Sequence, residues 1–298
     1  MRVNVCIPHY VRESVAAEDN PNGYGSLSEG ATLKRTIALN RCIGSLLNLQ
    51  RSQTSAVLNI GQQRIDHISN KQLPIELNII VMTDGENQLA DTLRLFGTMI
   101  RVEEISIEDP RHLALACRDH LIKNTDEAEL YVYMEDDLII HDGDFFEKQA
   151  WFIEKTNHQF CLMPHRYERI DMGGIDRMLV DGPLIEEYIN SFTNPVINAA
   201  EGNYRGLKKI SFDITNNPHS GMFVISNRQA KQLRELQLPR SGFNGPLETA
   251  ATLTVLQSFK VMKPGFSNYD FLCIEHGHPS FQNYIHQFPH KNGAGEHK

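Results

Sequence analysis

The chain has 298 residues, of which 41% are apolar and 22% charged, and its 29 basic and 37 acidic residues leave a formal net charge of −8 at pH 7. These values are typical of a folded globular protein and exclude disordered, fibrous and low-complexity classes. The excess of acids, without any run of Lys or Arg, excludes nucleic acid as the leading partner, because affinity for a phosphate backbone comes mostly from clustered cations.

No stretch of the sequence approaches the ~18 consecutive apolar residues of a membrane span, and residues 1–10 alternate apolar and polar positions from the start. We therefore expect a chain that starts at Met1, has no transmembrane segment and works in the cytoplasm, free or at the periphery of a membrane. The cysteines form no close pair, which predicts buried free thiols and neither a disulfide framework nor a cysteine zinc site. They are Cys6, Cys42, Cys117, Cys161 and Cys273.

Predicted strands and helices alternate along the first half of the chain. Residues 2–8 alternate in polarity and end at a proline, as a strand does, and the polar, glycine-bearing segment 12–32 favours a long loop able to close over a ligand. Apolar periodicity then predicts a helix at 33–52, a strand at 76–85, a helix at 87–97, a strand at 99–106, a helix at 111–124 and a strand at 129–140. This order predicts an α/β fold with a mainly parallel sheet between helices, and ligands at the carboxyl ends of its strands.

The second half is less regular. It predicts a helix at 144–156, a strand at 159–168, some forty residues of weak periodicity at 169–209 that read as an insertion, and regular elements at 208–213, 220–236, 246–259 and 261–268. No linker separates two domains. We expect one domain over 1–285, with a nucleotide-binding half at about 1–140, an acceptor and catalytic half at about 141–285, and a tail at 286–298 that is disordered from Asn292.

Three adjacent carboxylates, Glu135, Asp136 and Asp137, stand inside the apolar run 131–140. Their mutual repulsion and desolvation would be costly without a cation. Mg²⁺ or Mn²⁺ carried by a diphosphate supplies one, because these hard ions prefer carboxylate and phosphate oxygens and need only one or two protein carboxylates. The alternative is a solvated turn past the end of the strand. The apolar residues that follow favour a metal site.

With this motif the chain resembles the GT-A glycosyltransferases, whose D-x-D motif ends an apolar strand and takes the E-D-D form here. The resemblance implies that Asp137 binds the metal and that Glu135 and Asp136 face the ribose and sugar of a nucleotide-sugar donor. Further segments follow in the family's order. They are residues 7–10 (IPHY), 81–85 (VMTDG), 219–226 (HSGMFVIS), 245–250 (GPLETA) and 273–280 (CIEHGHPS).

By position, these segments imply further donor-site and metal residues. The donor side would include Pro8, His9, Tyr10, Arg12, Asp84 and Gly221. A C-terminal histidine would complete the metal site, either His278, which a glycine and a proline flank in a turn, or His276. Arg35 also flanks the loop 12–32 and could reach a phosphate, although an exposed arginine is more often simply solvated.

Glu248 is the only acid in its segment, because Thr249 stands where the family more often has Asp, and it matches the family's Gly-x-x-Glu variant. The resemblance implies that Glu248 is the base of an inverting transfer, although Glu at a helix start also serves as a simple cap. The implied reaction moves a sugar from a UDP or GDP donor to a glycan, lipid-linked or small-molecule acceptor, as in polysaccharide biosynthesis. The alternatives are a sugar nucleotidyltransferase, disfavoured by the missing G-x-G-x-R loop, and a non-catalytic glycan-binding or scaffold domain.

Overall fold

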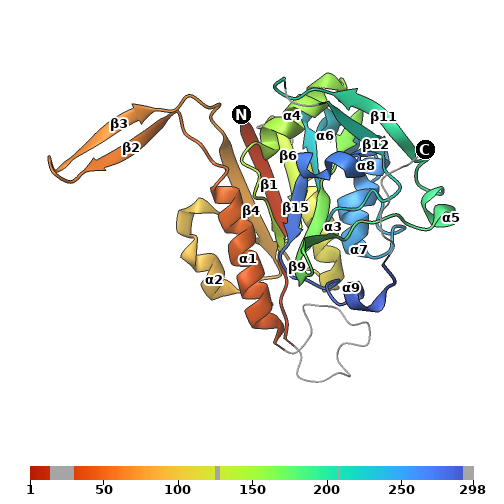
Figure 1. Ribbon diagram of the computed structural model, residues 1–298. Coiled ribbons are helices and arrows are strands. Elements are labelled where there is room, and N and C mark those ends of the chain that lie inside the picture. The colour runs from red at the N-terminus through yellow and green to blue at the C-terminus, as the bar shows by residue number, and fades with distance from the viewer. Residues whose placement is uncertain (14–29, 125–127, 207–208, 291–298) are drawn as a thin grey trace.

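The computed structural model describes residues 1–13, 30–124, 128–206 and 209–290 (Figure 1). Its central sheet has the strand order β13-β6-β1-β4-β5. Strands β1 (Arg2–Pro8), β4 (Glu76–Thr83), β5 (Arg101–Glu104) and β6 (Leu130–Met134) are parallel, and β13 (Met222–Ser226) is antiparallel to β6. The predicted α/β class with a mainly parallel sheet is confirmed.

Helices cover both faces of this sheet, because its strands are apolar on both sides. Val3, Val5 and Ile7 of β1 pack in one cluster with helices α1 (Ala31–Leu47) and α4 (Phe145–Lys155). Cys6 and the alternate residues of β4 and β6 pack in a second cluster with α3 (Leu113–Lys123) and α6 (Asn227–Arg234). Strands buried on both faces are the expected consequence of helical crossovers.

Two smaller sheets extend the molecule. One has the order β10-β9-β15-β7, with β7 at Leu138–Ile139, β9 at His165–Met172, β10 at Ile175–Leu179 and β15 at Cys273–His276. The other has the order β11-β12-β14-β8, with β8 at Phe160–Leu162, β11 at Val196–Gly202, β12 at Ile210–Ile214 and β14 at Lys260–Pro264. Strand β15, the last in sequence, therefore lies between two earlier strands.

Several expectations need correction. The run 129–140 is not one strand, because the three acids form a turn between β6 and β7, which belong to different sheets. The segment 169–209 is more regular than predicted, since it contains β10, β11 and α5 (Glu186–Ile189). The strand 159–168 divides into β8 and β9. The helix 246–259 is shorter, with a π-helical turn at Thr249–Leu253 between α7 (Pro246–Glu248) and α8 (Thr254–Leu256).

Four further strands and helices lie outside the three sheets and the central helices. They are the hairpin of β2 (Thr54–Asn59) and β3 (Arg64–Ser69), which the sequence pattern did not reveal, and helices α2 (Ala90–Leu95) and α9 (Tyr284–Gln287). The hairpin projects from the body as an arm (Figure 1). Most of the predicted loop 12–32 and the predicted disordered tail fall outside the described residues. In the part of the chain that the structure describes, we find no helix with the length and apolarity of a membrane span.

Candidate functional site

The acids lie at the carboxyl end of β6, where the central sheet gives way to β7. Asp136 and Asp137 are only 4% and 6% exposed. The acids do lie in a turn, as the alternative predicted, but Asp136 and Asp137 in this turn are buried and not solvated. Buried carboxylates need partners, and the surrounding elements supply them.

Gly221 holds the first acid in place. It precedes β13, has a φ of 65°, and its carbonyl accepts a hydrogen bond of 3.0 Å from the Glu135 amide. A Cβ at this position would lie 2.7 Å from Glu135 Oε2, so only glycine leaves room for the carboxylate. Burial, together with the charge of Asp137, raises the pKa of Glu135 to about 7.

His9 supports the second acid from behind. The ring is fully buried, its Nδ1 lies 2.6 Å from Asp136 Oδ2, and its Nε2 accepts a 3.1 Å hydrogen bond from the Leu89 amide. Burial, with help from the charge of Arg35, lowers the pKa of His9 to about 3, so the ring is neutral. Because Nε2 accepts, Nδ1 carries the proton and donates to the carboxylate. This geometry makes His9 an orienting residue for Asp136.

Arg35, on α1, bridges the second and third acids. Its guanidinium contacts Asp136 and donates to Asp137 Oδ2 at 2.9 Å, and its side chain is 13% exposed. The sequence indicated that this arginine flanks a loop and could reach a phosphate. The structure places it as the cation that balances the acid pair.

His276, at the end of β15, lies near Asp137, which Arg35 also contacts. Its Nε2 lies 3.6 Å from Asp137 Oδ2, and its Nδ1 lies 2.8 Å from Oε1 of the fully buried Glu168. Burial alone would lower the pKa of His276, but these two carboxylates raise it to about 9. Burial opposes ionisation of Asp137, yet His276 and Arg35 hold the pKa of that carboxyl well below its usual range.

We expect the free energy of unfolding to depend on His276 between pH 6.5 and 9. A base with a raised pKa contributes its full stabilisation below the unfolded value of 6.5, and this contribution is lost as the pH rises to about 9. The loss should be on the order of 3 kcal/mol at most. Urea denaturation from pH 6 to 9 should show a smaller decline in the free energy of unfolding for His276→Gln than for wild type. The control His286→Gln, at an exposed histidine, should show the wild-type decline. Equal declines for wild type and His276→Gln would contradict the assignment.

Three buried polar atoms in this region have no hydrogen-bond partner, Arg35 Nε, Asp137 Oδ1 and His278 Nε2. The last two, on Asp137 and His278, are of the kind that binds metal ions. Both residues line the same cavity, and burial lowers the pKa of His278, which favours the neutral ring with a free lone pair. A carboxylate oxygen suits Mn²⁺ or Mg²⁺, and an imidazole nitrogen beside it suits a transition-metal ion such as Mn²⁺ better than Mg²⁺. Among the described residues no three His, Cys, Asp or Glu side chains gather as a complete metal site. The residues thus fit an ion that takes its remaining ligands from a substrate.

Asp137 and His278 line the first of two cavities that adjoin each other. The first, of about 190 Å³, is lined by Pro8, Tyr10, Arg35, Pro110, Arg111, Leu113, Ala114, Glu135, Asp136, Asp137, Leu247, His276, His278 and Ser280. The second, of about 450 Å³, is lined by Glu135, Arg166, Leu184, Tyr188, Asn217, His219, Phe243, Asn244, Leu247, Glu248, His276, Ser280 and Phe281. Glu135, Leu247, His276 and Ser280 border both. The arrangement is of two adjoining cavities with the carboxylate of Glu135 at their junction.

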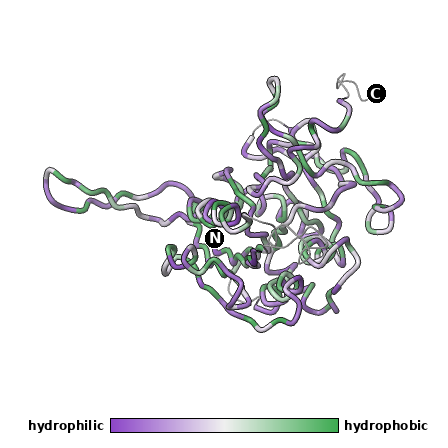
Figure 2. Tube along the Cα trace, turned by 90° about the horizontal axis from the view of Figure 1, so that it is seen from below, coloured by the Kyte–Doolittle hydropathy of each residue, from purple (hydrophilic) through white to green (hydrophobic). Residues whose placement is uncertain are grey.

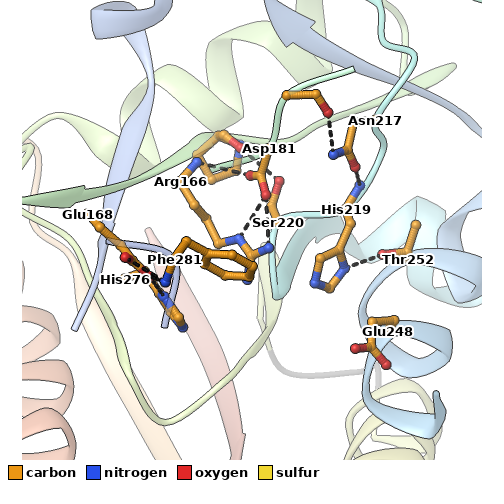
Figure 3. Close-up of polar contacts among 12 residues, drawn as sticks. Arg166, Glu168, Asp181, Asn217, His219, Ser220, Glu248, Thr252, His276 and Phe281 are labelled. Carbon is orange, nitrogen blue, oxygen red and sulfur yellow. Dashed lines mark hydrogen bonds and ion pairs between the residues drawn. The ribbon is translucent and has the colours of Figure 1, made fainter. Parts of the chain in front are cut away.

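Glu248 lines the second cavity and also caps its helix. Its Oε2 accepts a 3.0 Å hydrogen bond from the Gly245 amide, which is the capping role anticipated as the alternative. The carboxylate is half-buried and close enough to raise the pKa of Glu135. Figure 3 shows Glu248 beside His219 and Thr252. The cap uses one lone pair of the Glu248 carboxylate. The remaining lone pairs are available to a molecule in the second cavity.

A buried ionic cluster lies next to the second cavity, which its member Arg166 lines (Figure 3). Arg166 donates through Nε and Nη2 to Asp181 Oδ1 at 3.0 and 2.8 Å, and Lys263 Nζ donates to Asp181 Oδ2 at 3.1 Å. Burial lowers the pKa of Lys263 to about 8 against the pull of Asp181. Lys263 also donates to the backbone oxygen of His219 at 2.6 Å, which ties the loop before β13 to β14.

The remaining donor-side residues divide into two groups. Pro8 and the buried Tyr10 line the first cavity, with the exposed Arg12 beside the tyrosine. Asp84 instead closes its own turn, accepting from the amides of Glu86 and Asn87 at 3.0 and 2.7 Å, and lies outside the lining of both cavities. A role of Asp84 in binding a base stays a prediction.

Three functional-site residues were undervalued in the sequence, namely Arg35, Glu168 and Asp181. Glu168 accepts hydrogen bonds from His276, Ser280 and Phe281, and so fixes the C-terminal segment of the site. A signal for it existed, because Arg166 and Glu168 occupy alternate positions of a strand and therefore share a face. Asp181 had no such signal, since it lies in a loop.

No protein-family model matches the chain, and no curated protein matches it in sequence. Among solved structures, it is similar to residues 1–349 of S. aureus TarS, with a TM-score of 0.44 and 12% identity over 88% of this chain and 58% of that one. The complex of that protein with UDP-GlcNAc gives a TM-score of 0.39 and 13% identity over 88% and 56%. GalNAc-T7 with UDP, GalNAc and Mn²⁺ gives 0.45 and 13% over 93% and 43%. The chain thus spans about half the length of these proteins, and the likeness is a partial one of chain path.

Proposed function

We propose that this protein is a glycosyltransferase that moves a sugar from a nucleotide-diphosphate donor to an acceptor hydroxyl. The observation that carries the proposal is the pair of unpartnered buried atoms, Asp137 Oδ1 and His278 Nε2, in a cavity beside an acid-lined second cavity. The first cavity would hold the donor and the second the acceptor. Glu135, at their junction, would then lie beside the transferred sugar.

Asp137 and His278, with His276 as the alternative, would hold Mn²⁺ or Mg²⁺ together with the donor's diphosphate. Such an ion stabilises the negative charge that develops on the departing diphosphate. Arg35 lies against the same carboxylates and has five N–H donors in a rigid fork, so it suits phosphate oxygens. Binding of a diphosphate would give Arg35 an anionic partner besides Asp136 and Asp137.

The second cavity supplies what the acceptor needs. Glu248 can take the proton of an attacking hydroxyl, and a direct displacement with one base gives inversion at the anomeric carbon. Phe243 and Tyr188, with ring centroids 5.8 Å apart, form an apolar wall suited to the face of a sugar or lipid-linked group. UDP- and GDP-sugars are the proposed donors, and a glycan or lipid-linked molecule the proposed acceptor.

A nucleotide panel tests the proposal. We expect UDP or GDP with Mn²⁺ to raise the melting temperature by several degrees, because a ligand at 100 times its Kd stabilises the folded state by about 2.7 kcal/mol. Each component alone should give a much smaller shift, since neither fills the coordination shell by itself. Differential scanning fluorimetry with Mn²⁺, with nucleotide, and with both provides the measurement. Shifts that persist unchanged in excess EDTA would count against a shared metal and nucleotide site.

A further inference from the structure

The arm formed by β2 and β3 stands away from the body in two perpendicular views (Figures 1 and 2). A bridge between Arg51 and Ile75 fixes its base, and beyond that base the two strands pair with each other over residues 54–69. No other strand of the described chain pairs with either one. An isolated two-stranded hairpin is at best marginally stable in water. The arm therefore has the form of an element that is completed by a partner.

The arm exposes large apolar side chains on one face near its tip. Leu58 and Ile65 lie directly opposite each other in the register and are 66% and 52% exposed, and Ile60, in the loop, is 77% exposed. Side chains alternate between faces along a strand, so Arg64 and Asp66 share the opposite face with Val57. One face thus carries the apolar pair Leu58 and Ile65, and the other carries Arg64 and Asp66 together with the exposed Val57 and Ile68.

The backbone of β3 is also prepared for a further strand. Asn70 donates a hydrogen bond of 2.8 Å to the Gln53 oxygen, which makes these two residues a hydrogen-bonded pair of the antiparallel ladder. Because the pattern alternates, Arg64 and Asp66 bond to β2, whereas the N–H and C=O groups of Ile65 point outward. The outer edge of β3 therefore presents a free donor and acceptor at the residue with the exposed isoleucine.

We propose that the arm pairs with the arm of a second copy of this chain, β3 against β3 and antiparallel, about a two-fold axis at Ile65. In this register Arg64 of each copy faces Asp66 of the other, and the apolar face carries the continuous row Leu58, Ile65, Ile65, Leu58. In this register residues 64–66 of the two β3 strands pair directly, and residues 67–69 of each copy lie beyond the end of the other copy's strand. The pattern is self-complementary, as a two-fold interface requires.

The charged residues of β3 favour a second copy of this chain as the partner of the arm. An antiparallel strand centred on Ile65 must offer an acid to Arg64 and a base to Asp66, and a second copy does both. Strand β2 carries no charged residue, so its edge has no comparable register. In the single copy Arg64 Nε bonds to Asp66 Oδ1 at 2.8 Å, a pair that two copies would exchange.

Sedimentation equilibrium of the full chain from 1 to 200 µM tests the pairing. We expect concentration-dependent association toward twice the monomer mass of 33.9 kDa. Ile65→Lys should weaken association at least about tenfold, because two lysines would meet at the axis. Ile68→Lys is the matched control, since Ile68 is 51% exposed, lies on the other face of the same strand and is outside the apolar row. Circular dichroism melting should show both variants folded, because neither side chain is buried.

Charge reversal tests the register. Arg64→Glu and Asp66→Arg should each weaken association, and the double variant should restore it, since the opposite charges would face each other again. A wild-type chain that stays monomeric to 200 µM would overturn the proposal, and so would equal effects of the variants at Ile65 and Ile68 or a double variant that fails to restore. Co-sedimentation of monomeric wild type with phosphatidylcholine and phosphatidylglycerol vesicles, lost in Ile65→Lys, would assign the arm to lipid and also overturn it.

Discussion

Asp137→Asn should abolish the Mn²⁺-dependent stabilisation of the protein by UDP or GDP and reduce sugar transfer to background. The amide keeps the shape and one acceptor oxygen but loses the charge that an ion with a diphosphate requires. It also removes the anion shared by Arg35 and His276. The loss is expected to be large because Oδ1 is buried and has no protein partner that could compensate.

The measurement is isothermal titration of nucleotide with and without Mn²⁺. Asp91→Asn is the control, because Asp91 is exposed and pairs only with Arg94 among the described residues. The control should bind as wild type does. If Asp137→Asn binds UDP and Mn²⁺ as tightly as wild type, Asp137 is not a metal ligand and the donor site lies elsewhere.

Glu248→Gln should leave donor binding intact and lower kcat by a factor on the order of 10² to 10⁴, the usual contribution of a general base. Glutamine retains an oxygen for the Gly245 amide, so the helix cap and the melting temperature should be preserved. Glu248→Ala removes both the base and the cap. Comparison of the two variants separates catalysis from stability.

The product's configuration provides an independent readout. An inverting transfer with Glu248 as base gives the anomer opposite to that of the donor, which proton NMR of the product distinguishes. Near-normal turnover in Glu248→Gln, or a product with the donor's configuration, would remove the assignment. His219→Asn then becomes the variant to examine, because His219 lines the same cavity and burial keeps its ring neutral.

The central fold could be predicted because its physics is local. Strand β1, helix α3 and strand β6 each place apolar residues at regular positions. A chain in which such strands and helices alternate can adopt few arrangements. The acid triplet could be placed at a strand end for the same reason. The division of its apolar run into β6 and β7 could not, since the partner of β7 is β15, well over a hundred residues later.

The network around the site depends on distant pairs that a single sequence does not disclose. Arg35 meets Asp137 across 102 residues, and His276 meets Glu168 across 108. Asp137 and His276 were predicted as metal ligands, but no pattern in the sequence links them to Arg35 and Glu168. The arm was missed because its apolar residues are few and alternate with polar ones whose roles depend on a partner. Elements that show a periodic pattern within a few residues could be predicted. Contacts between residues far apart in the sequence could not.

The position of β15 also sets the order in which this protein can assemble. The strand inserts between β9 and β7, pairing Glu275 with Tyr167 on one side and with Ile139 on the other. Until it has left the ribosome, those two strands keep open edges and Asp137 lacks His276. Strands with unpaired edges are prone to wrong pairing, and closing long loops is slow. The contacts around Asp137 are thus incomplete until β15 has been synthesised, and the nascent chain keeps two open strand edges until then.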